Sequence, residues 1–238
     1  MEKKELMYEG KAKKVWSCED PDMCIVDYKD AATALNGLKK GTIVGKGIIN
    51  NKLSNYMMKL ITKELGIPTH LIEELSDRET LVKKVKIVPL EVIARNIAAG
   101  SLAKRLGMEE GTVMSKPVLE FCYKSDELGD PMVNRYHILA ADFCSEKDLD
   151  TITDYTFKIN AFMQKFFLEH GIILVDFKIE FGKTSDGTVV LADEISPDTC
   201  RFWDSKTKEK LDKDRFRRDM GGVEDAYNEV MRRLMGEC

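Results

Sequence analysis

The sequence predicts an α+β fold, and three observations lead to that class. Segments with strand-like alternation and segments with helical spacing follow one another irregularly along the 238 residues. Pairs of strand-like segments are separated by tight-turn sequences, which indicates antiparallel hairpins in place of a regular βαβ rhythm. The pattern also changes around Pro89, so we expect a β-rich N-terminal lobe at residues 1–87 and an α+β C-terminal lobe at residues 88–238.

The N-terminal lobe begins with an expected hairpin and continues into a helix. Residues 13–17 and 23–28 have strand composition and flank the turn sequence Glu19-Asp20-Pro21-Asp22. The apolar residues of segment 48–65 recur at helical spacing, and Gly66 stands where glycine commonly ends a helix. Further strands are expected at residues 71–75, 80–88 and 90–95.

The C-terminal lobe is expected to contain three helices. Gly100-Ser101 opens a short one, which Gly107 closes. A longer helix starts at Ser145 with a capping-box candidate sequence, carries apolar residues at helical spacing, and stops at Gly171. The apolar residues between positions 223 and 234 predict the last helix.

The strand expected at residues 173–182 alternates strictly between apolar and ionisable side chains. Because successive side chains of a strand point to opposite faces, one face should carry an apolar set: Val175, Phe177, Ile179 and Phe181. The other face should carry only ionisable groups: Asp176, Lys178 and Glu180. A solvated strand more often presents Thr, Ser and Lys, so this face indicates a functional site.

A returning strand at residues 188–195 follows the hairpin signal Asp186-Gly187. If these two residues form the loop, Glu180 lies directly opposite Asp193, with Cβ atoms about 5 Å apart. Two carboxylates at that separation repel each other unless a cation lies between them, and a divalent cation with oxygen ligands would suit. A four-residue loop would shift the register, and a hairpin with a solvated acidic edge would show the same spacing, so both alternatives stay open.

Composition narrows the class of protein. The chain has 37 Lys plus Arg against 41 Asp plus Glu, a net charge of −4, which argues against a nucleic-acid-binding protein that relies on bulk positive charge. Its six cysteines show no C-x-x-C spacing and indicate free thiols in a reducing cytosol. No apolar run approaches the ~18 residues of a membrane span, and the first residues hold no apolar signal core. We therefore expect a cytoplasmic protein that acts without nucleic acid or membrane.

The segment Gly10-Lys11-Ala12-Lys13 has the composition of a polyphosphate site. Gly10 would let the backbone approach a ligand closely, and Lys11 and Lys13 would project on the same side of an extended segment. The spacing of a Walker A loop is absent. Two solvated lysines beside a glycine would have the same sequence.

A second anion site is indicated by Arg95 at the end of a strand and Ser101 at a helix start. Arg201 could supply a second guanidinium, which binds phosphate through paired hydrogen bonds. An N-cap role for Ser101, a surface ion pair of Arg95 and a cation–π surface contact of Arg201 beside Phe202-Trp203 would fit the same sequence. Cys200 lies nearby, but no histidine accompanies it, which argues against cysteine nucleophilic catalysis.

Two long motifs resemble signatures of the SAICAR synthetases, the phosphoribosylaminoimidazole-succinocarboxamide synthase family of purine biosynthesis. They lie at residues 88–101 and 174–182. The resemblance spans essentially the whole chain through shorter motifs: Gly10-Lys11-Ala12-Lys13, Gly45-Lys46-Gly47, Asp130-Pro131-Met132, Ser196-Pro197-Asp198 and Asp212-Lys213-Asp214-Arg215. The chain departs from the family pattern at Thr199-Cys200, where many relatives have Ser or Gly, and at Asn36, where some carry an acidic residue.

The resemblance implies a two-lobed α+β fold with ATP in the cleft between the lobes, reminiscent of protein kinases and ATP-grasp enzymes. It also implies an ATP-dependent ligase that joins carboxyaminoimidazole ribotide to L-aspartate, with Mg²⁺ as cofactor and a homodimer as the assembly. ADP and phosphate would be the other products, and an acyl phosphate the intermediate.

Roles for individual residues follow from the same resemblance. ATP would be bound by Gly10, Lys11, Ala12, Lys13, Lys83, Glu180 and Asp193, of which Glu180 and Asp193 would also hold Mg²⁺. The other substrates would be bound by Arg95, Ser101, Lys124, Asp198, Arg201 and Arg215. Lys178 and Asp176 would be catalytic, with Lys178 approaching the reacting carboxylate.

Two rival functions use some of the same residues. A small-molecule kinase would share the phosphate-binding lysines and the carboxylate pair, but it would need an Asp base in an H-R-D-like loop, and no such tripeptide occurs. A regulatory nucleotide-binding module would need no second anion site. The combination of Arg95, Ser101 and Arg201 therefore argues against it.

Overall fold

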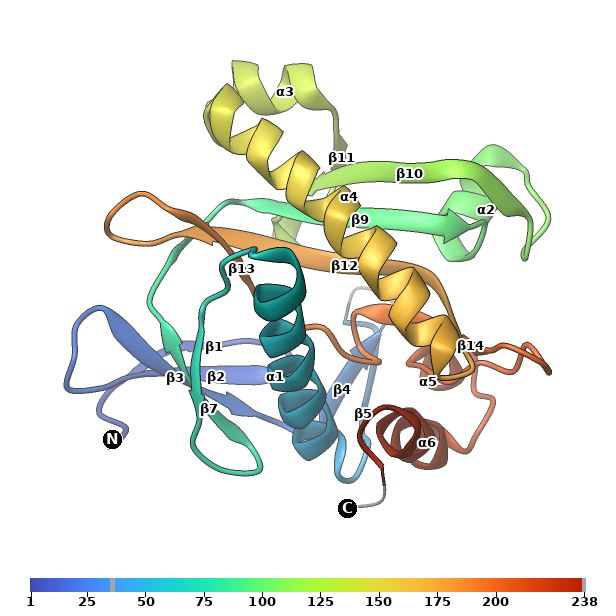
Figure 1. Cartoon of the computed structure of the whole chain (residues 1–238), viewed down its shortest axis with the longest axis horizontal. Coiled ribbons are helices and arrows are strands. Elements are labelled where there is room, and N and C mark those ends of the chain that lie inside the picture. Colours follow the sequence, from blue (N-terminus) through green and yellow to red (C-terminus); the bar gives the residue numbers. More distant parts are fainter. Residues whose placement is uncertain (35–36, 237–238) are drawn as a thin grey trace.

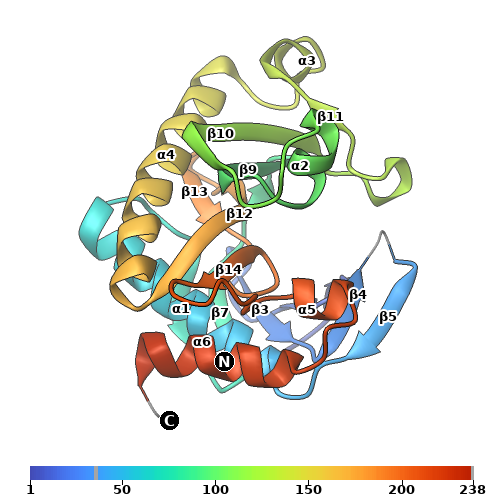
Figure 2. The same ribbon diagram turned by 90° about the vertical axis from the view of Figure 1, so that its right-hand side faces the viewer.

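The structure, a computed structural model, describes residues 1–34 and 37–236, so Asn36 and Cys238 lie outside it. Two sheets whose named strands all pair antiparallel form the two halves of the molecule, one above the other in Figures 1 and 2. The expected α+β class is thereby confirmed. Among the described residues, no helix combines the length and the apolar character needed to cross a membrane.

The first sheet has the strand order β1-β2-β3-β7-β6. Its strands are Leu6–Glu9 (β1), Lys13–Ser17 (β2), Met23–Tyr28 (β3), Glu79–Lys83 (β7) and Leu71–Glu74 (β6). A separate two-stranded sheet pairs Ala31–Ala34 (β4) with Lys39–Thr42 (β5). Both strands of the expected hairpin are confirmed, and Lys13 begins β2, where it pairs with Tyr28 at the end of β3 and follows the glycine-containing turn.

The second sheet is built around one long strand, Ile172–Lys183 (β12), and has the order β11-β10-β9-β12-β13. Its other strands are Leu90–Ile97 (β9), Val113–Tyr123 (β10), Met132–Val133 (β11) and Val189–Ala192 (β13). Lys86–Ile87 (β8) and Cys200–Asp204 (β14) also pair with β12. Because β12 contacts four strands, its side chains are placed by more neighbours than those of an edge strand.

Helices pack on both halves: Lys46–Leu65 (α1), Gly100–Leu106 (α2), Arg135–Ala140 (α3), Glu146–Glu169 (α4), Asp214–Arg217 (α5) and Val223–Met235 (α6). Helix α4 crosses the second sheet (Figure 1) and buries Ile152, Ile159 and Met163 in the main core. Helix α1 adds Leu53 and Met57 to the same core. The long helices expected from apolar spacing are therefore confirmed, because that spacing places one face of each helix in the core.

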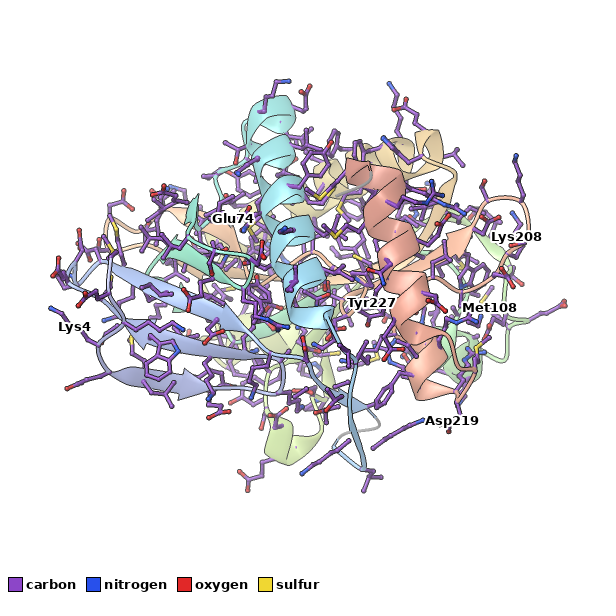
Figure 3. The ribbon with its side chains drawn as sticks, turned by 90° about the horizontal axis from the view of Figure 1, so that it is seen from below. Lys4, Glu74, Met108, Lys208, Asp219 and Tyr227 are labelled. Atoms are coloured by element: carbon purple, nitrogen blue, oxygen red, sulfur yellow. The ribbon has the colours of Figure 1, made fainter. Side chains whose placement is uncertain are left out.

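Helix α6 packs against α1, and Figure 3 shows Tyr227 on the side of α6 toward α1. The C-terminal segment thus lies beside elements of the first half (Figure 2). The boundary between residues 87 and 88 remains a prediction.

The expected strand at 80–88 is wrong as a single element. It divides into β7, in the first sheet, and β8, which pairs with β12 in the second. The chain crosses between the two sheets at residues 84–85, so no single partner strand can pair with the whole segment.

The alternation of β12 is confirmed for Phe177, Ile179 and Phe181, which lie in the main core. It is wrong for Val175, which belongs to a smaller cluster with Ala99 and Trp203. The pairing of β12 with β14 shifts register between Leu174 and Asp176. Such a bulge inserts one extra residue and reverses the face that follows.

The expected pairing of Glu180 with Asp193 is also wrong. Glu180 pairs with Ala192, and the backbone N–H of Thr184 donates to the carbonyl of Thr188, so the loop has three residues. Gly187 closes this loop in the left-handed region, with φ +85°, as three-residue hairpins commonly require. A shift of one residue moves Asp193 beyond the end of β13.

The start of α1 provides a prediction about stability. The Asp30 carboxylate accepts hydrogen bonds from the N–H groups of Gly45 and Gly47 and from both terminal nitrogens of Arg78, at 2.7 and 2.9 Å. The Arg78 guanidinium lowers the pKa of Asp30 to about 2. A lowered folded-state pKa stabilises the fold above the unfolded value near 4, and that contribution is lost as the pH falls toward 2.

We therefore expect Asp30→Asn to reduce the free energy of unfolding by about 1 kcal/mol at pH 7, after allowance for solvent screening. At pH 2 the variant and the parent should differ much less. Urea unfolding at both pH values measures the effect, with Asp150→Asn, in an exposed ion pair with Arg135, as the control. An equal loss at both pH values would show that the charge of Asp30 does not matter.

Candidate active site

A cavity of about 910 Å³ lies between the two sheets and collects most of the residues that the sequence singled out. Its lining includes all but two of them: Gly10, Lys11, Ala12, Lys13, Lys83, Arg95, Lys124, Asp176, Lys178, Glu180, Asp193, Asp198 and Arg201. Ser101 and Arg215 are absent from the described part of the lining. Ser101 nonetheless accepts a hydrogen bond from Arg95, whereas the Arg215 guanidinium donates to the carbonyls of Gly221 and Lys210.

The centre of the cavity holds a carboxylate pair bridged by a lysine. Lys178 Nζ lies 2.7 Å from Glu180 Oε1 and 3.1 Å from Asp193 Oδ2. Lys124 Nζ also donates to Glu180 Oε1, at 2.8 Å, and Lys13 pairs with Asp193. Glu180 is only 3% exposed, so the alternative of a solvated acidic edge is wrong. The two carboxylates meet around Lys178 although they are not opposite each other in the hairpin.

Backbone conformation explains how Asp193 reaches this position. It follows the last residue of β13 and has φ +58°, in the left-handed region that non-glycine residues seldom adopt. Such a conformation turns the chain sharply at the strand end. Strained residues of this kind persist where surrounding contacts hold them, and they cluster at functional sites.

The charges of this centre depend on one another. Burial would raise the pKa of Asp193, but Lys13 and Lys178 hold it well below its ordinary value. Burial would lower the pKa of Lys178, yet Asp193, Glu180 and Glu91 raise it well above its ordinary value. Both groups are therefore ionised at neutral pH.

The carboxylate pair has the donor chemistry that Mg²⁺ requires. Mg²⁺ is usually held by one or two carboxylates together with water and substrate phosphates. Among the described residues, no cluster of three His, Cys, Asp or Glu side chains could hold a metal ion alone. Glu180 and Asp193 thus fit a cation that arrives with a phosphorylated ligand. When that cation is not bound, the neighbouring lysines offset the negative charge of the two carboxylates.

One end of the cavity holds two arginines that are joined by Asp176. Arg95 NH1 and Arg201 NH1 both donate to Asp176 Oδ2, at 2.9 and 2.8 Å. Arg95 NH2 donates to Ser101 Oγ at 3.1 Å. Asp176 thus joins the two predicted anion-binding arginines, and the three groups come from β9, β12 and β14.

The opposite end combines apolar and cationic groups. Val15, Val26 and Val82 of the first sheet line it, next to Lys83 and the turn containing Lys11. Lys11 Nζ lies 2.6 Å from Asp126 Oδ1, an ion pair between the two halves of the molecule. Apolar walls beside lysines suit a ligand with a flat ring and a polyphosphate.

Sequence reasoning missed a buried network beneath the cavity. Lys46 has no exposed surface, and its Nζ donates to Asp198 Oδ2 at 3.0 Å. Tyr227 donates to Asp198 Oδ1 at 2.6 Å, and Lys213 to Oδ2 at 3.2 Å. Lys46 and Lys213 stood only as members of short motifs. Nothing local in the sequence showed that they would meet, since 152 residues separate Lys46 from Asp198.

Two other residues of the lining, His70 and Cys200, have side chains that stay uncharged at neutral pH. His70 lines the cavity, and burial lowers its pKa to about 4, so its imidazole is neutral at physiological pH. Cys200 is buried, and burial raises the pKa of its thiol far above its ordinary value. A thiol that stays protonated is a poor nucleophile, which agrees with the interpretation from sequence.

Known proteins resemble this chain over nearly its whole length. The SAICAR synthetase family model matches residues 6–234. A phosphoribosylaminoimidazole-succinocarboxamide synthase of Lachnoclostridium phytofermentans is 63% identical over 98% of this chain and 99% of its own. The enzyme of that name from Coprothermobacter proteolyticus is 60% identical over the same shares.

Solved structures agree. The crystal structure of phosphoribosylaminoimidazole-succinocarboxamide synthase from Ehrlichia chaffeensis superimposes with a TM-score of 0.95, at 46% identity over 98% of this chain and 100% of its own. A SAICAR synthetase (Type-2) in complex with ADP gives a TM-score of 0.93 at 48% identity, over 97% of each chain. With its fold, its cavity and its full-length matches all in agreement, the chain belongs to the SAICAR synthetase family, the ATP-dependent ligases of purine biosynthesis that its motifs resembled.

Proposed function

We propose that the cavity joins the carboxylate of carboxyaminoimidazole ribotide to the amine of L-aspartate, with ATP as the energy source. The observation that carries this proposal is that one cavity brings together arginines at one end, lysines at the other, and a carboxylate–lysine centre between them. Lys11 and Lys13 would bind the ATP phosphates. Arg95 and Arg201 would bind the ribotide phosphate, because guanidinium groups bind phosphate oxygens in pairs.

The chemistry requires an activated carboxylate, because a carboxylate oxygen is a poor leaving group. A carboxylate oxygen of the ribotide would attack the γ-phosphorus, breaking the bond to the β-phosphate and releasing ADP. The aspartate amine would then attack the carbonyl carbon of the acyl phosphate, expel phosphate and lose a proton. The protein's part is positioning and charge neutralisation, since phosphoryl transfer offers little covalent work to an enzyme.

Specific side chains would carry those tasks. Lys178 is ionised between Glu180 and Asp193, so it would balance negative charge as the ribotide carboxylate meets ATP. Asp176 would hold Arg95 and Arg201 toward the ribotide. Glu180 and Asp193 would hold Mg²⁺, which when bound would neutralise charge on the phosphates. Lys83, Lys124 and Asp198 line the same cavity and stay proposed ligand contacts.

An isotope experiment tests the acyl phosphate. With ¹⁸O in the ribotide carboxylate, we expect one labelled oxygen in each phosphate released, because that oxygen stays on phosphorus when the amine displaces it. Mass spectrometry of the phosphate measures the label, and unlabelled ribotide in ¹⁸O-water provides the control. Label that stays out of the phosphate would exclude the acyl phosphate, and release of pyrophosphate would indicate adenylation.

Two further expectations belong to this proposal. We expect a homodimer, which light scattering of the purified protein measures directly, and a cytoplasmic location. A small-molecule kinase, the rival function, would release ADP with an alcohol substrate and would not depend on an amino acid. ADP release with the ribotide, measured with and without L-aspartate, separates the two.

A further inference from the structure

The two arginines of the phosphate end are held in the same way. Arg95 Nε donates to Glu120 Oε2 at 2.8 Å, and Arg201 Nε donates to Asp214 Oδ2 at 3.0 Å. Each also donates through NH1 to the shared Asp176. Two edges of each guanidinium are therefore bound by carboxylates before any ligand arrives.

Glu120 and Asp214 lie behind the arginines and do not belong to the described lining of the cavity. Their side chains are 5% and 2% exposed, and they come from different elements, β10 and α5. Burial would raise the pKa of Asp214, but Arg201 and Arg217 lower it, so its carboxylate is charged. A buried carboxylate that contacts arginines and lies outside the cavity acts through those arginines.

The remaining guanidinium nitrogens, NH2 of Arg95 and NH2 of Arg201, lie beside the same segment, Gly100-Ser101. Arg95 NH2 donates to Ser101. Arg201 NH2 makes no hydrogen bond among the described residues, and it lies so close to Gly100 that a Cβ there would come within 2.5 Å of it. Because Gly100 and Ser101 are adjacent, the two NH2 groups converge on the same segment.

We propose that Glu120 and Asp214 are positioning residues that hold Arg95 and Arg201 so that their NH2 groups meet the phosphate of the ribotide. This inference rests on the proposed function, in which that phosphate binds at these arginines. An arginine side chain loses rotamer entropy when it is fixed. Fixing it in the folded protein removes that cost from binding, which is how preorganised sites gain affinity.

Asp214 is itself secured by a second buried carboxylate. Asp212 has no exposed surface, and it accepts the backbone N–H of Asp214 at 2.7 Å and that of Phe202 at 2.9 Å. These bonds connect the start of α5 to the strand that carries Arg201. The position of Asp214 relative to Arg201 is thus fixed through the backbone as well as through the ion pair.

The test uses Asp214→Asn and Glu120→Gln, which keep the shape of each side chain and remove its charge. We expect the KM for the ribotide to rise about tenfold or more, the usual scale for a lost charged hydrogen bond, while the KM for ATP changes less than twofold. The matched control is Asp204→Asn. Asp204 lies on the same strand as Arg201, but its arginine partner is Arg233, and Arg233 lies outside the described cavity lining. A substitution that only disturbed the structure would change the KM values for both the ribotide and ATP, or would change neither.

Arg201→Lys separates failure of this inference from failure of the proposed function. If that variant leaves the ribotide KM unchanged, the proposed role of Arg201 is wrong. If it raises the KM but Asp214→Asn does not, the positioning role is wrong. The double variant Arg201→Lys, Asp214→Asn should have a ribotide KM no higher than the higher of the two single-variant values. The effects of residues that act through one contact are not additive.

Asp214→Glu serves if Asp214→Asn does not fold. It keeps the charge and displaces the carboxylate by one methylene group, so we expect a smaller rise in ribotide KM with ATP binding intact by calorimetry. A ribotide KM equal to that of the parent would overturn the proposal.

Discussion

Asp193→Asn is expected to lower kcat by about 10²–10³-fold, the scale on which an enzyme loses one electrostatic contact to a transition state. The Asp193 carboxylate lies beside Lys13 and 3.1 Å from Lys178, at the point where the ATP phosphates and the ribotide carboxylate would meet. Asparagine keeps the size of the side chain and removes the charge that would help to hold Mg²⁺. Steady-state rates at saturating ribotide and aspartate, measured over a range of Mg²⁺ concentrations, give the effect.

Asp186→Asn is the matched control, because Asp186 lies in the exposed loop of the same hairpin. Its kcat should equal that of the parent. Near-normal turnover of Asp193→Asn at ordinary Mg²⁺ concentration would show that Asp193 does not have the proposed role in holding Mg²⁺. A loss that is fully recovered at high Mg²⁺ would support a role in holding the cation.

Asp198→Asn is expected to reduce the free energy of unfolding by about 3–5 kcal/mol, the usual cost of removing one partner of a buried ion pair. Asp198 accepts hydrogen bonds from Lys46, Lys213 and Tyr227. Lys46 has no exposed surface, so its ammonium group cannot turn to water when its counter-ion is lost. Urea unfolding at pH 7 measures the difference.

A second substitution separates lost charge from lost packing. Lys46→Met combined with Asp198→Asn removes both charges of the pair. It should therefore be less destabilised than the sum of the single variants, because no buried ammonium group remains opposite a neutral amide. An effect of Asp198→Asn below about 1 kcal/mol, or additive losses, would show that the pair contributes little.

The network also accounts for the proposed place of Asp198 among the ligand contacts. Lys213 lines the cavity while it donates to Asp198, and burial lowers the pKa of Lys213. Loss of Asp198 would thus disturb a cationic group of the cavity together with the core. Activity of the variant should be compared only under conditions in which calorimetry shows it to be folded.

Local patterns were sufficient for much of the fold. The helical spacing of α1 and α4 and the alternation of β12 each depend on residues a few positions apart, and burial against one core preserves that spacing. Gly66 ends α1 with φ +65°, as a glycine at that position predicts. Where a neighbouring strand intervened, local reasoning failed: residues 80–88 divide between two sheets, and the bulge near Val175 reverses its face.

The hairpin of β12 and β13 contains both a feature that local sequence predicted and one that it did not. Its strands and its turn were predictable, but the choice between a two-residue and a three-residue loop was not, because Asp186-Gly187 fits either. That choice shifts the pairing by one residue. The proximity of Glu180 and Asp193 depends instead on the left-handed turn at Asp193 and on Lys178, which attracts both carboxylates.

The sequence by itself determined the fold class, the family and a set of functional candidates most of which line the cavity, because motifs and periodicity are properties of neighbouring positions. Only the tertiary structure decided which of those residues meet. It placed Glu120 and Asp214 behind the arginines, joined Lys46 to Asp198, and turned Arg215 toward backbone carbonyls. Ionic contacts between distant segments depend on burial and on the paths of β9, β12 and β14, and those are set by packing of the whole chain, not by any local pattern.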